Sequence, residues 1–313
     1  MNKLVIASRA SALAMWQSKY IAAQLSGIHS ELEVEIKVFK TQGDAILDVP
    51  LAKIGGKGLF TKELEDAILR GEADLAVHSL KDVPTHFENG LILSGVTKRA
   101  DRRDALLSCK YASIDQLPRG AVVGTASLRR RMQLLRKRPD LIVKSLRGNV
   151  PSRIEKLKDG LYDAIVLAYA GLERLDMTRS VQFVAPIDLS IMLPAMGQGV
   201  LGLESKNNAE ILALVKPLID KQALVESTIE RDFIDALNGS CQVPIGVCAE
   251  LFEDQSIYAS AIVGLPNGKE ILDAEVRGDS SVYTSLGKEL ADKMLAQGAR
   301  GILKRAELMI DSL

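Results

Sequence analysis

The sequence predicts an α/β protein with two similar lobes, each a sheet flanked by helices, followed by a smaller α+β domain. Short apolar runs alternate with helical patterns as far as Leu203, and the pattern of the first lobe starts again near Ala100. From about Pro217 the pattern changes to one long helix, three strands and a final helix. A length of 313 residues is sufficient for two or three domains.

Composition and charge argue against a membrane protein, a secreted disulfide-rich protein and a protein that attracts nucleic acid through its overall charge. Forty basic residues balance forty acidic ones, so no overall field attracts nucleic acid or a membrane surface. The longest apolar run, Ala164 to Leu172, is far shorter than the roughly 20 residues of a membrane span, and the first residues lack an apolar signal core. We therefore expect a cytoplasmic protein. Cys109, Cys241 and Cys248 lack metal-type spacing, so neither a disulfide framework nor a metal site is expected.

The first lobe opens with a strand over residues 4–8, and Ser11 is a good N-cap for the helix that follows. We expect one face of this helix to pack into the core, formed by Leu13, Trp16, Tyr20 and Ala23. Further strands are expected over residues 34–40 and 91–96, and a helix over residues 59–69.

The stretch Ala73 to Pro84 combines a buried strand with polar residues at its end. Open α/β sheets bind ligands at the carboxyl ends of their strands, so a strand over residues 73–79 would place His78, Ser79, Lys81 and Asp82 at a cleft. A surface ion pair on a solvated turn is the alternative interpretation of Lys81 and Asp82. For His78, a structural hydrogen bond is the alternative to a cleft role.

The loop Asp48 to Gly58 contains Gly55-Gly56-Lys57-Gly58, which resembles a phosphate cradle but lacks the Walker spacing. We interpret it as a mobile lid that carries one lysine, Lys57; nucleotide binding is the alternative.

The second lobe repeats the plan of the first. Val5 to Arg9 matches Val122 to Ala126, and Gly71 to Asp74 matches Gly160 to Asp163, although the spacing between matches varies. Strands are expected over residues 121–124, 141–145 and 163–168, with helices from 128 to 138 and from about 150 to 158.

Arginines are concentrated in the second lobe. Ser127, Arg129 and Arg130 begin a helix directly after a strand, where backbone N–H groups already favour an anion. Arg147 and Arg153 lie in the next turn and at the next helix start. Guanidinium groups pair with carboxylate or phosphate, so this cluster indicates a ligand with several acidic groups. A solvated helix face is the alternative.

The third domain carries one notable thiol. A helix with Val225, Ile229, Phe233 and Ala236 on one face ends near Asn238-Gly239, and Cys241 follows in a loop. The dipole at a helix C-terminus does not favour a thiolate, so a reaction at Cys241 would need a strongly electrophilic partner.

Four motifs together resemble the porphobilinogen deaminase family, also called hydroxymethylbilane synthase. They are Ser79-Leu80-Lys81-Asp82-Val83-Pro84, Gly124-Thr125-Ala126-Ser127-Leu128-Arg129-Arg130, Leu146-Arg147-Gly148-Asn149 and Cys241-Gln242-Val243-Pro244-Ile245-Gly246. The likeness covers almost the whole chain, in the right order. It implies two lobes like those of type II periplasmic binding proteins, flanking a cleft, plus a C-terminal α+β domain.

The resemblance also implies the chemistry. A dipyrromethane cofactor, built from the substrate porphobilinogen, would be joined to Cys241 by a thioether. Porphobilinogen would lose ammonia to give an electrophilic azafulvene, which the terminal pyrrole attacks. Four additions and a hydrolysis would release hydroxymethylbilane, a precursor in porphyrin and heme biosynthesis.

Residue by residue, the resemblance makes Asp82 the catalytic carboxylate, which stabilises the developing positive charge. The implied cofactor binders are Cys241, Lys81, Ser11, Ser79, Thr125, Ser127, Arg129, Arg130 and Arg147. The implied substrate binders are Arg9, Arg153, Gln17, Gln198 and Lys57.

On this basis we expect lobe 1 to comprise residues 1–97 and 198–215, lobe 2 residues 98–197, and the C-terminal domain residues 216–313. We expect a monomer that binds porphobilinogen and neither nucleic acid nor membrane. Two other classes compete: a solute-binding protein without chemistry, and a nucleic-acid binder that uses the arginines, although no aromatic residues interleave with them for base stacking.

Overall fold

The structure is a computed structural model that describes residues 2–41, 61–87, 89–237 and 243–310. The chain divides into two compact units. Among the described residues, the first unit comprises 2–41, 61–87, 89–100 and 199–224, and the second comprises 101–198, 225–237 and 243–310. In the part of the chain described, no helix is both long and apolar enough to span a membrane.

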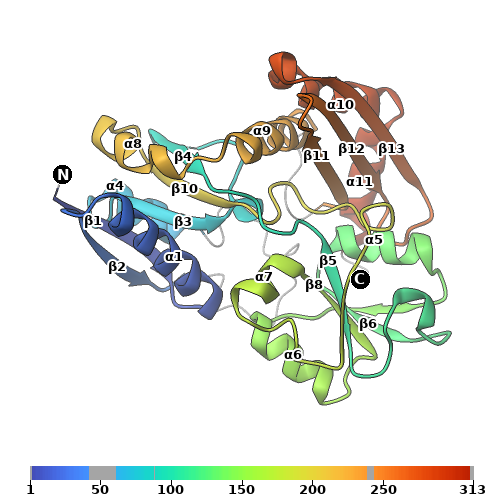
Figure 1. Cartoon of the computed structure of the whole chain (residues 1–313). Coiled ribbons are helices and arrows are strands. Elements are labelled where there is room, and N and C mark those ends of the chain that lie inside the picture. Colours follow the sequence, from blue (N-terminus) through green and yellow to red (C-terminus); the bar gives the residue numbers. More distant parts are fainter. Residues whose placement is uncertain (1, 42–60, 88, 238–242, 311–313) are drawn as a thin grey trace. The chain divides into compact units, whose positions relative to one another are not determined.

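The first unit is built on a five-stranded sheet with the order β2-β1-β3-β10-β4 (Figure 1). Strand β1 runs parallel to β2 and β3, whereas β10 runs antiparallel to β3 and β4. The strands are β1 (Lys3–Arg9), β2 (Glu33–Phe39), β3 (Leu75–Ser79), β4 (Leu91–Val96) and β10 (Leu201–Lys206). The helices are α1 (Ala12–Ile28), α4 (Lys62–Leu69) and α8 (Ala209–Val215), with 3-10 turns η1 (Leu80–Asp82) and η3 (Lys216–Leu218).

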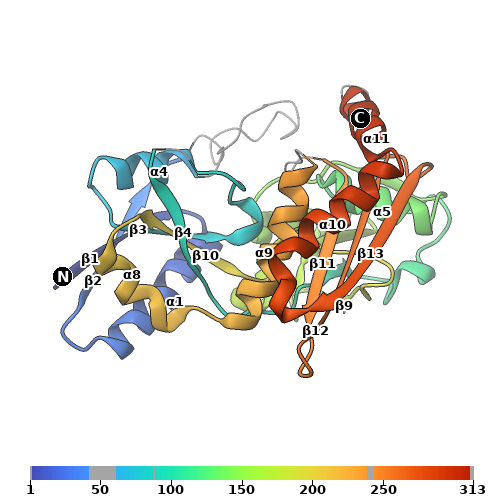
Figure 2. The same cartoon turned by 90° about the horizontal axis from the view of Figure 1, so that it is seen from above.

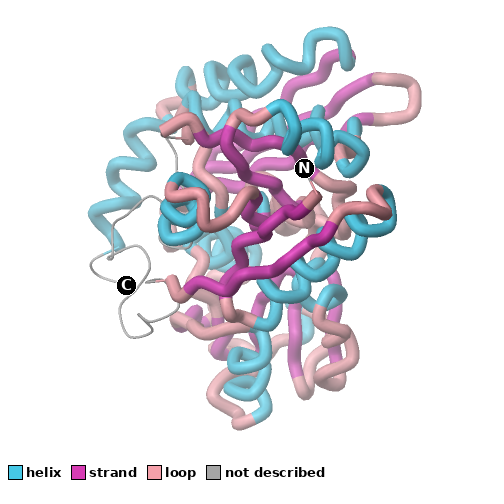
Figure 3. The backbone as a smooth tube through the Cα atoms, turned by 90° about the vertical axis from the view of Figure 1, so that its left-hand side faces the viewer, coloured by secondary structure: helices cyan, strands magenta, loops and turns pink. Residues whose placement is uncertain are grey.

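Two apolar clusters cover the two faces of this sheet. One packs Ile21 and Leu25 of α1 against Leu75 of β3, and the other packs Leu64 of α4 against Ala76 of β3. Because neighbouring residues of a strand point to opposite faces, α1 and α4 lie on opposite sides of the sheet. Figure 3 shows these strands in magenta near the N-terminus, with helices on either side.

The predicted core face of the first helix was wrong. Ala14, Gln17, Ser18, Ile21 and Leu25 are the buried residues of α1, whereas Tyr20 is 41% exposed and stacks on Trp16. The buried face combines Ile21 and Leu25 with the small or polar Ala14, Gln17 and Ser18, so a search for large apolar residues selected the neighbouring face. The N-cap was correct, since Ser11 Oγ accepts a hydrogen bond from the N–H of Ala14.

The second unit contains a sheet of the same plan, ordered β7-β6-β8-β5-β9. Strand β6 is parallel to β7 and β8, and β5 is antiparallel to β8 and β9. The strands are β5 (Asp104–Ser108), β6 (Val122–Gly124), β7 (Ile142–Lys144), β8 (Ala164–Ala168) and β9 (Phe183–Pro186). The helices are α5 (Leu128–Lys137), α6 (Val150–Lys158) and α7 (Tyr169–Arg174), with the 3-10 turn η2 (Ile114–Gln116).

Matching hydrogen bonds confirm the repeated plan. The N–H of Val5 donates to Asp74 Oδ2 at 2.8 Å, and the N–H of Asp74 donates back to the carbonyl of Val5. Val122 and Asp163 make the same pair of contacts in the second sheet. Each aspartate therefore closes the turn that leads into the central strand of its sheet.

The rest of the second unit is a small α+β region. Its antiparallel sheet has the order β11-β12-β13, and α10 and α11 pack on it (Figure 2). The elements are α9 (Lys221–Ala236), which begins in the first unit, β11 (Ile245–Leu251), β12 (Ser256–Gly264), β13 (Ile271–Asp279), η4 (Ser280–Val282), α10 (Tyr283–Ala296) and α11 (Ala299–Ile310). Ile229 and Phe233 of α9 are fully buried in its core, as the sequence predicts.

The predicted fold class is confirmed: two α/β sheet lobes and a small C-terminal α+β region. The sequence analysis missed the strands β5 and β9 and the helices α7, α8 and α11. Strands β5 and β9 are not part of the alternation of parallel strand and helix on which the sequence prediction rests, because both enter the sheet antiparallel to β8 or to each other.

Candidate functional site

Asp82 lies on the turn η1, directly after β3. The N–H of Leu80 donates to the carbonyl of Val200, and the side chains of Leu80 and Val83 are buried in one apolar cluster. These contacts fix the position of the turn. Asp82 itself is exposed and makes no hydrogen bond or ion pair with a described residue. Its carboxylate oxygens are available to a ligand.

Other predicted residues of the first unit gather at the same edge of the sheet. Arg9 ends β1 and Ser79 ends β3, and these strands are parallel neighbours. The buried Gln17 donates a hydrogen bond from Nε2 to Ser79 Oγ at 2.8 Å and so orients the Ser79 hydroxyl. Ser11 caps α1 at the same edge, and Lys81 is partly buried beside Asp82.

His78 is a structural residue. Its side chain is 4% exposed, and Nε2 lies 2.8 Å from Oε2 of the fully buried Glu204 on β10. This contact joins the neighbouring strands β3 and β10 on the face covered by α4, which favours the structural alternative for His78.

In the second unit, the matching edge carries Thr125 and Ser127. Ser127 Oγ accepts from the N–H of Arg130 and caps α5, while Thr125 Oγ1 accepts from the N–H of Ser127. Both hydroxyls therefore shape the turn after β6. Each retains its own O–H for donation to an acceptor.

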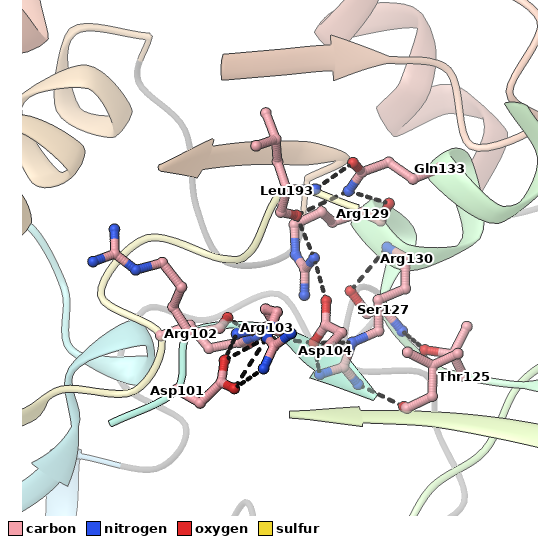
Figure 4. Close-up of polar contacts among 12 residues, drawn as sticks. Asp101, Arg102, Arg103, Asp104, Thr125, Ser127, Arg129, Arg130, Gln133 and Leu193 are labelled. Carbon is pink, nitrogen blue, oxygen red and sulfur yellow. Dashed lines mark hydrogen bonds and ion pairs between the residues drawn. The ribbon is translucent and has the colours of Figure 1, made fainter. Parts of the chain in front are cut away.

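A buried charge cluster lies beside this turn (Figure 4). Arg129 Nη1 donates to Asp104 Oδ2 at 2.7 Å, and Arg130 Nη2 donates to Asp104 Oδ1 at 2.8 Å. Gln198 Nε2 also donates to Asp104 Oδ1, at 3.0 Å. The two arginines donate further to the carbonyls of Leu193 and Val166.

The electrostatics of this cluster favour an anion. Burial alone would raise the pKa of Asp104, but the guanidinium groups of Arg129 and Arg130 hold it well below its usual range. Two fixed cations thus share one carboxylate and leave a net positive charge in a buried place. The structure engages both arginines with Asp104, and their contact with a cofactor remains a prediction.

Arg147 and Arg153 lie after β7, on the turn that leads into α6 and on its first turn. Burial lowers the pKa of Arg147, and its buried Nη1 atom has no hydrogen-bond partner among the described residues. A desolvated cation without a carboxylate is unfavourable unless a ligand supplies one. Arg153 Nε donates to the carbonyl of Gly148 at 2.7 Å, which closes the same turn.

Two predicted site residues, Lys57 and Cys241, lie outside the described residues. In the described ranges, no group of three or more histidine, cysteine or acidic side chains is arranged to hold a metal ion.

Two family models match the chain. Residues 4–213 match "Porphobilinogen deaminase, dipyromethane cofactor binding domain", and residues 224–296 match "Porphobilinogen deaminase, C-terminal domain". The chain belongs to the porphobilinogen deaminase family.

Curated relatives agree along the full length. The chain is 58% identical over 307 residues to the porphobilinogen deaminase of a Nitratiruptor species, covering 98% of each protein. It is 55% identical over 312 residues to the porphobilinogen deaminase of Sulfurimonas denitrificans, covering 100% of each.

Among solved structures, the periplasmic VFT2 domain of Bordetella pertussis BvgS is 16% identical and has a TM-score of 0.41, with 68% of this chain and 85% of that chain covered.

Family membership brings a dipyrromethane cofactor, and the residues present fit it. Every pyrrole ring of such a group bears acidic side chains, and the buried, unpartnered Nη1 of Arg147 lacks such an acceptor in the part of the chain described. The net positive charge of the cluster formed by Asp104, Arg129 and Arg130 also favours the binding of an acidic group.

The sequence reading of this porphobilinogen deaminase family member missed Asp104 as a site residue. The sequence pattern drew attention to the arginine-rich stretch alone, whereas Asp104 lies 25 positions before Arg129 in the chain. An available signal was an acidic residue at the start of the fully apolar run Ala105-Leu106-Leu107, since a buried carboxylate needs a cationic partner.

Proposed function

We propose that this chain condenses four porphobilinogen molecules head to tail, with loss of ammonia, on a dipyrromethane primer bound through a thioether to Cys241. Hydrolysis then releases hydroxymethylbilane, which makes the protein a transferase of tetrapyrrole biosynthesis. The observation that carries the proposal is the match to the porphobilinogen deaminase family along the chain, at 58% identity to one relative.

Asp82 is the proposed catalytic residue. Loss of ammonia from porphobilinogen leaves positive charge on a pyrrole ring, and a fixed carboxylate stabilises that charge in the transition state. The same oxygens accept hydrogen bonds from pyrrole N–H groups. Two features support this role: the buried anchors Leu80 and Val83, which hold the turn, and the absence of any described partner for the carboxylate.

Cationic and hydroxyl groups bind the acidic side chains of the pyrroles. We assign the cofactor to Lys81, Ser11, Ser79, Thr125, Ser127, Arg129, Arg130 and Arg147, and the incoming substrate to Arg9, Arg153, Gln17, Gln198 and Lys57. When bound, the dipyrromethane group supplies the pyrrole carbon that forms the new C–C bond. Guanidinium groups suit this task because they bind carboxylates through two parallel hydrogen bonds.

Intact-mass measurement of the purified protein tests the function. We expect an adduct of two pyrrole units on the wild-type chain and none on Cys241→Ala, with no turnover of porphobilinogen by that variant. Cys109→Ala is the matched control, because Cys109 is a free, partly buried cysteine of the second unit. It should keep both the adduct and the activity. Active wild-type protein without an adduct would contradict the proposal.

We also propose the three domains expected from the sequence, with residues 1–97 and 198–215, 98–197, and 216–313. The protein is further proposed to be a cytoplasmic monomer that binds neither nucleic acid nor membrane. Light scattering of the purified protein tests whether it is a monomer, and fractionation of cells tests whether it is cytoplasmic.

A further inference from the structure

Two buried glutamates on α9 connect this helix to the rest of the second unit. Glu226 and Glu230 are 1% and 0% exposed, and they lie one helical turn apart. Such burial of carboxylates is costly unless strong donors surround them.

Glu230 accepts two backbone hydrogen bonds from different segments. The N–H of Gly197 donates to Oε2 at 2.7 Å, and the N–H of Ala249 on β11 donates to Oε1 at 3.1 Å. Each oxygen of the carboxylate therefore fixes a different part of the backbone, one on the C-terminal sheet and one on the turn before Gln198.

Glu226 supports the same arrangement through Arg102. Arg102 Nη2 donates to Glu226 Oε2 at 3.0 Å, and Leu251 N–H donates to Oε1. Although burial would lower the pKa of Arg102, the neighbouring Cys248, Glu226 and Glu230 raise it above its usual range. Arg102 is thus a firmly charged partner for these carboxylates.

The turn that Glu230 holds leads directly to the arginine cluster. Gly197 has a positive φ of 66°, and the next residue, Gln198, donates from Nε2 to the carbonyl of Arg102 and to Asp104 Oδ1. Asp104 in turn holds Arg129 and Arg130. Hydrogen bonds and the one peptide link between Gly197 and Gln198 therefore connect α9 to both guanidinium groups.

We propose that Glu230 is a positioning residue for cofactor binding: through Gly197 and Gln198 it sets the place of Asp104 between Arg129 and Arg130. This inference rests on the proposed function. On this proposal α9, the helix that precedes Cys241 in the sequence, positions the two arginines of the same unit that bind acidic groups of the cofactor.

The test follows cofactor loading. Full-length protein, produced in cells that cannot make porphobilinogen, is incubated with porphobilinogen, and the gain of two pyrrole units is timed by intact mass. We expect Glu230→Gln to load at least about tenfold more slowly, since a misplacement of about 1 Å can cost about 100-fold. The amide offers one acceptor oxygen, and its NH₂ group meets the second backbone N–H.

Ser108→Ala is the matched control. Ser108 is fully buried at the other end of β5, and its hydroxyl makes three hydrogen bonds, with the carbonyl of Asp163 and the N–H groups of Lys110 and Tyr111. It is expected to lose thermal stability and to load at the wild-type rate.

A double variant, Glu230→Gln with Asp104→Asn, distinguishes positioning from general stability. If Glu230 acts through Asp104, the double variant loads less slowly than the product of the fold-changes measured for Glu230→Gln and Asp104→Asn alone. Loading of folded Glu230→Gln at the wild-type rate, slowing of Ser108→Ala in proportion to its lost stability, or fully multiplicative effects would each overturn the proposal.

If Glu230→Gln does not fold, Glu230→Asp takes its place, because the shorter carboxylate keeps the charge but reaches one backbone segment at most. The same slowing is expected, and loading at the wild-type rate overturns the proposal. Wild-type protein that never gains a two-pyrrole adduct refutes the proposed function itself, which is a different outcome.

Discussion

Gln17 Nε2 donates a hydrogen bond to Ser79 Oγ at 2.8 Å and so connects α1 with the last residue of β3. Ser79 is three residues before Asp82, and Gln17 is only 3% exposed. A buried amide in this place orients a hydroxyl at the edge of the sheet, next to the turn that carries the proposed catalytic carboxylate.

Replacing Gln17 by leucine tests that relationship. We expect Gln17→Leu to lose about 1 kcal/mol in the free energy of unfolding, the usual contribution of such a hydrogen bond. Its turnover of porphobilinogen should also fall, because the Ser79 hydroxyl is no longer oriented. Urea unfolding and steady-state kinetics measure the two effects. Gln24→Ala, an exposed position on the same helix, should change neither; full activity of Gln17→Leu would contradict the assignment.

Asp82→Ala should keep its fold and lose turnover by at least about 100-fold, as expected when a group that stabilises transition-state charge is removed. The side chain is exposed and has no described partner, so its removal costs little stability. Thermal unfolding and initial rates check both parts. Glu31→Ala, an exposed acidic residue of the same unit, is the control. Near-normal turnover by Asp82→Ala would show that another carboxylate is catalytic.

Arg147→Gln should leave stability unchanged or slightly higher and slow the gain of the two-pyrrole adduct, timed by intact mass, by roughly tenfold or more, the equivalent of one lost charge-assisted hydrogen bond. Burial disfavours this guanidinium in the free protein, where its Nη1 has no described partner. Arg131→Gln is the control: burial lowers the pKa of Arg131 as well, but its Nη1 donates to the carbonyl of Val143. It should lose stability and gain the adduct at the wild-type rate. The opposite pattern would mean that Arg147 is structural.

Asp104→Asn should lower the free energy of unfolding by about 3–5 kcal/mol, because it leaves two buried guanidinium groups without their carboxylate. Asp101→Asn is the control. Asp101 pairs with the partly exposed Arg103, and such pairs contribute about 1 kcal/mol at most. Equal losses in the two variants would argue against a special role for the cluster.

The same carboxylate predicts an effect of pH on stability. The pKa of Asp104 is lower in the folded protein than in the unfolded chain, where it is about 3.9. Its contribution is therefore fully present above about pH 5 and is lost as the pH falls through and below 4. The difference in unfolding free energy between wild type and Asp104→Asn should shrink over that range in urea titrations. A constant difference from pH 6 to pH 3 would contradict the assigned ionisation.

The sequence by itself determined the fold class, the repeated lobe and the family. Apolar runs bounded by glycine turns, the N-caps Ser11 and Ser127, and the joint set of motifs were enough, since each depends on neighbouring residues. The local pattern also placed Lys81 and Asp82 at the end of a buried strand.

Only the tertiary structure decided which polar groups pair with one another. The contacts of Asp104 with Arg129, of His78 with Glu204 and of Glu230 with Gly197 join residues that are 25, 126 and 33 positions apart. Long-range pairing of this kind follows from the order and direction of strands, which no local pattern contains. For the same reason the buried face of α1 and the strands β5 and β9 became evident only when the sheets were assembled.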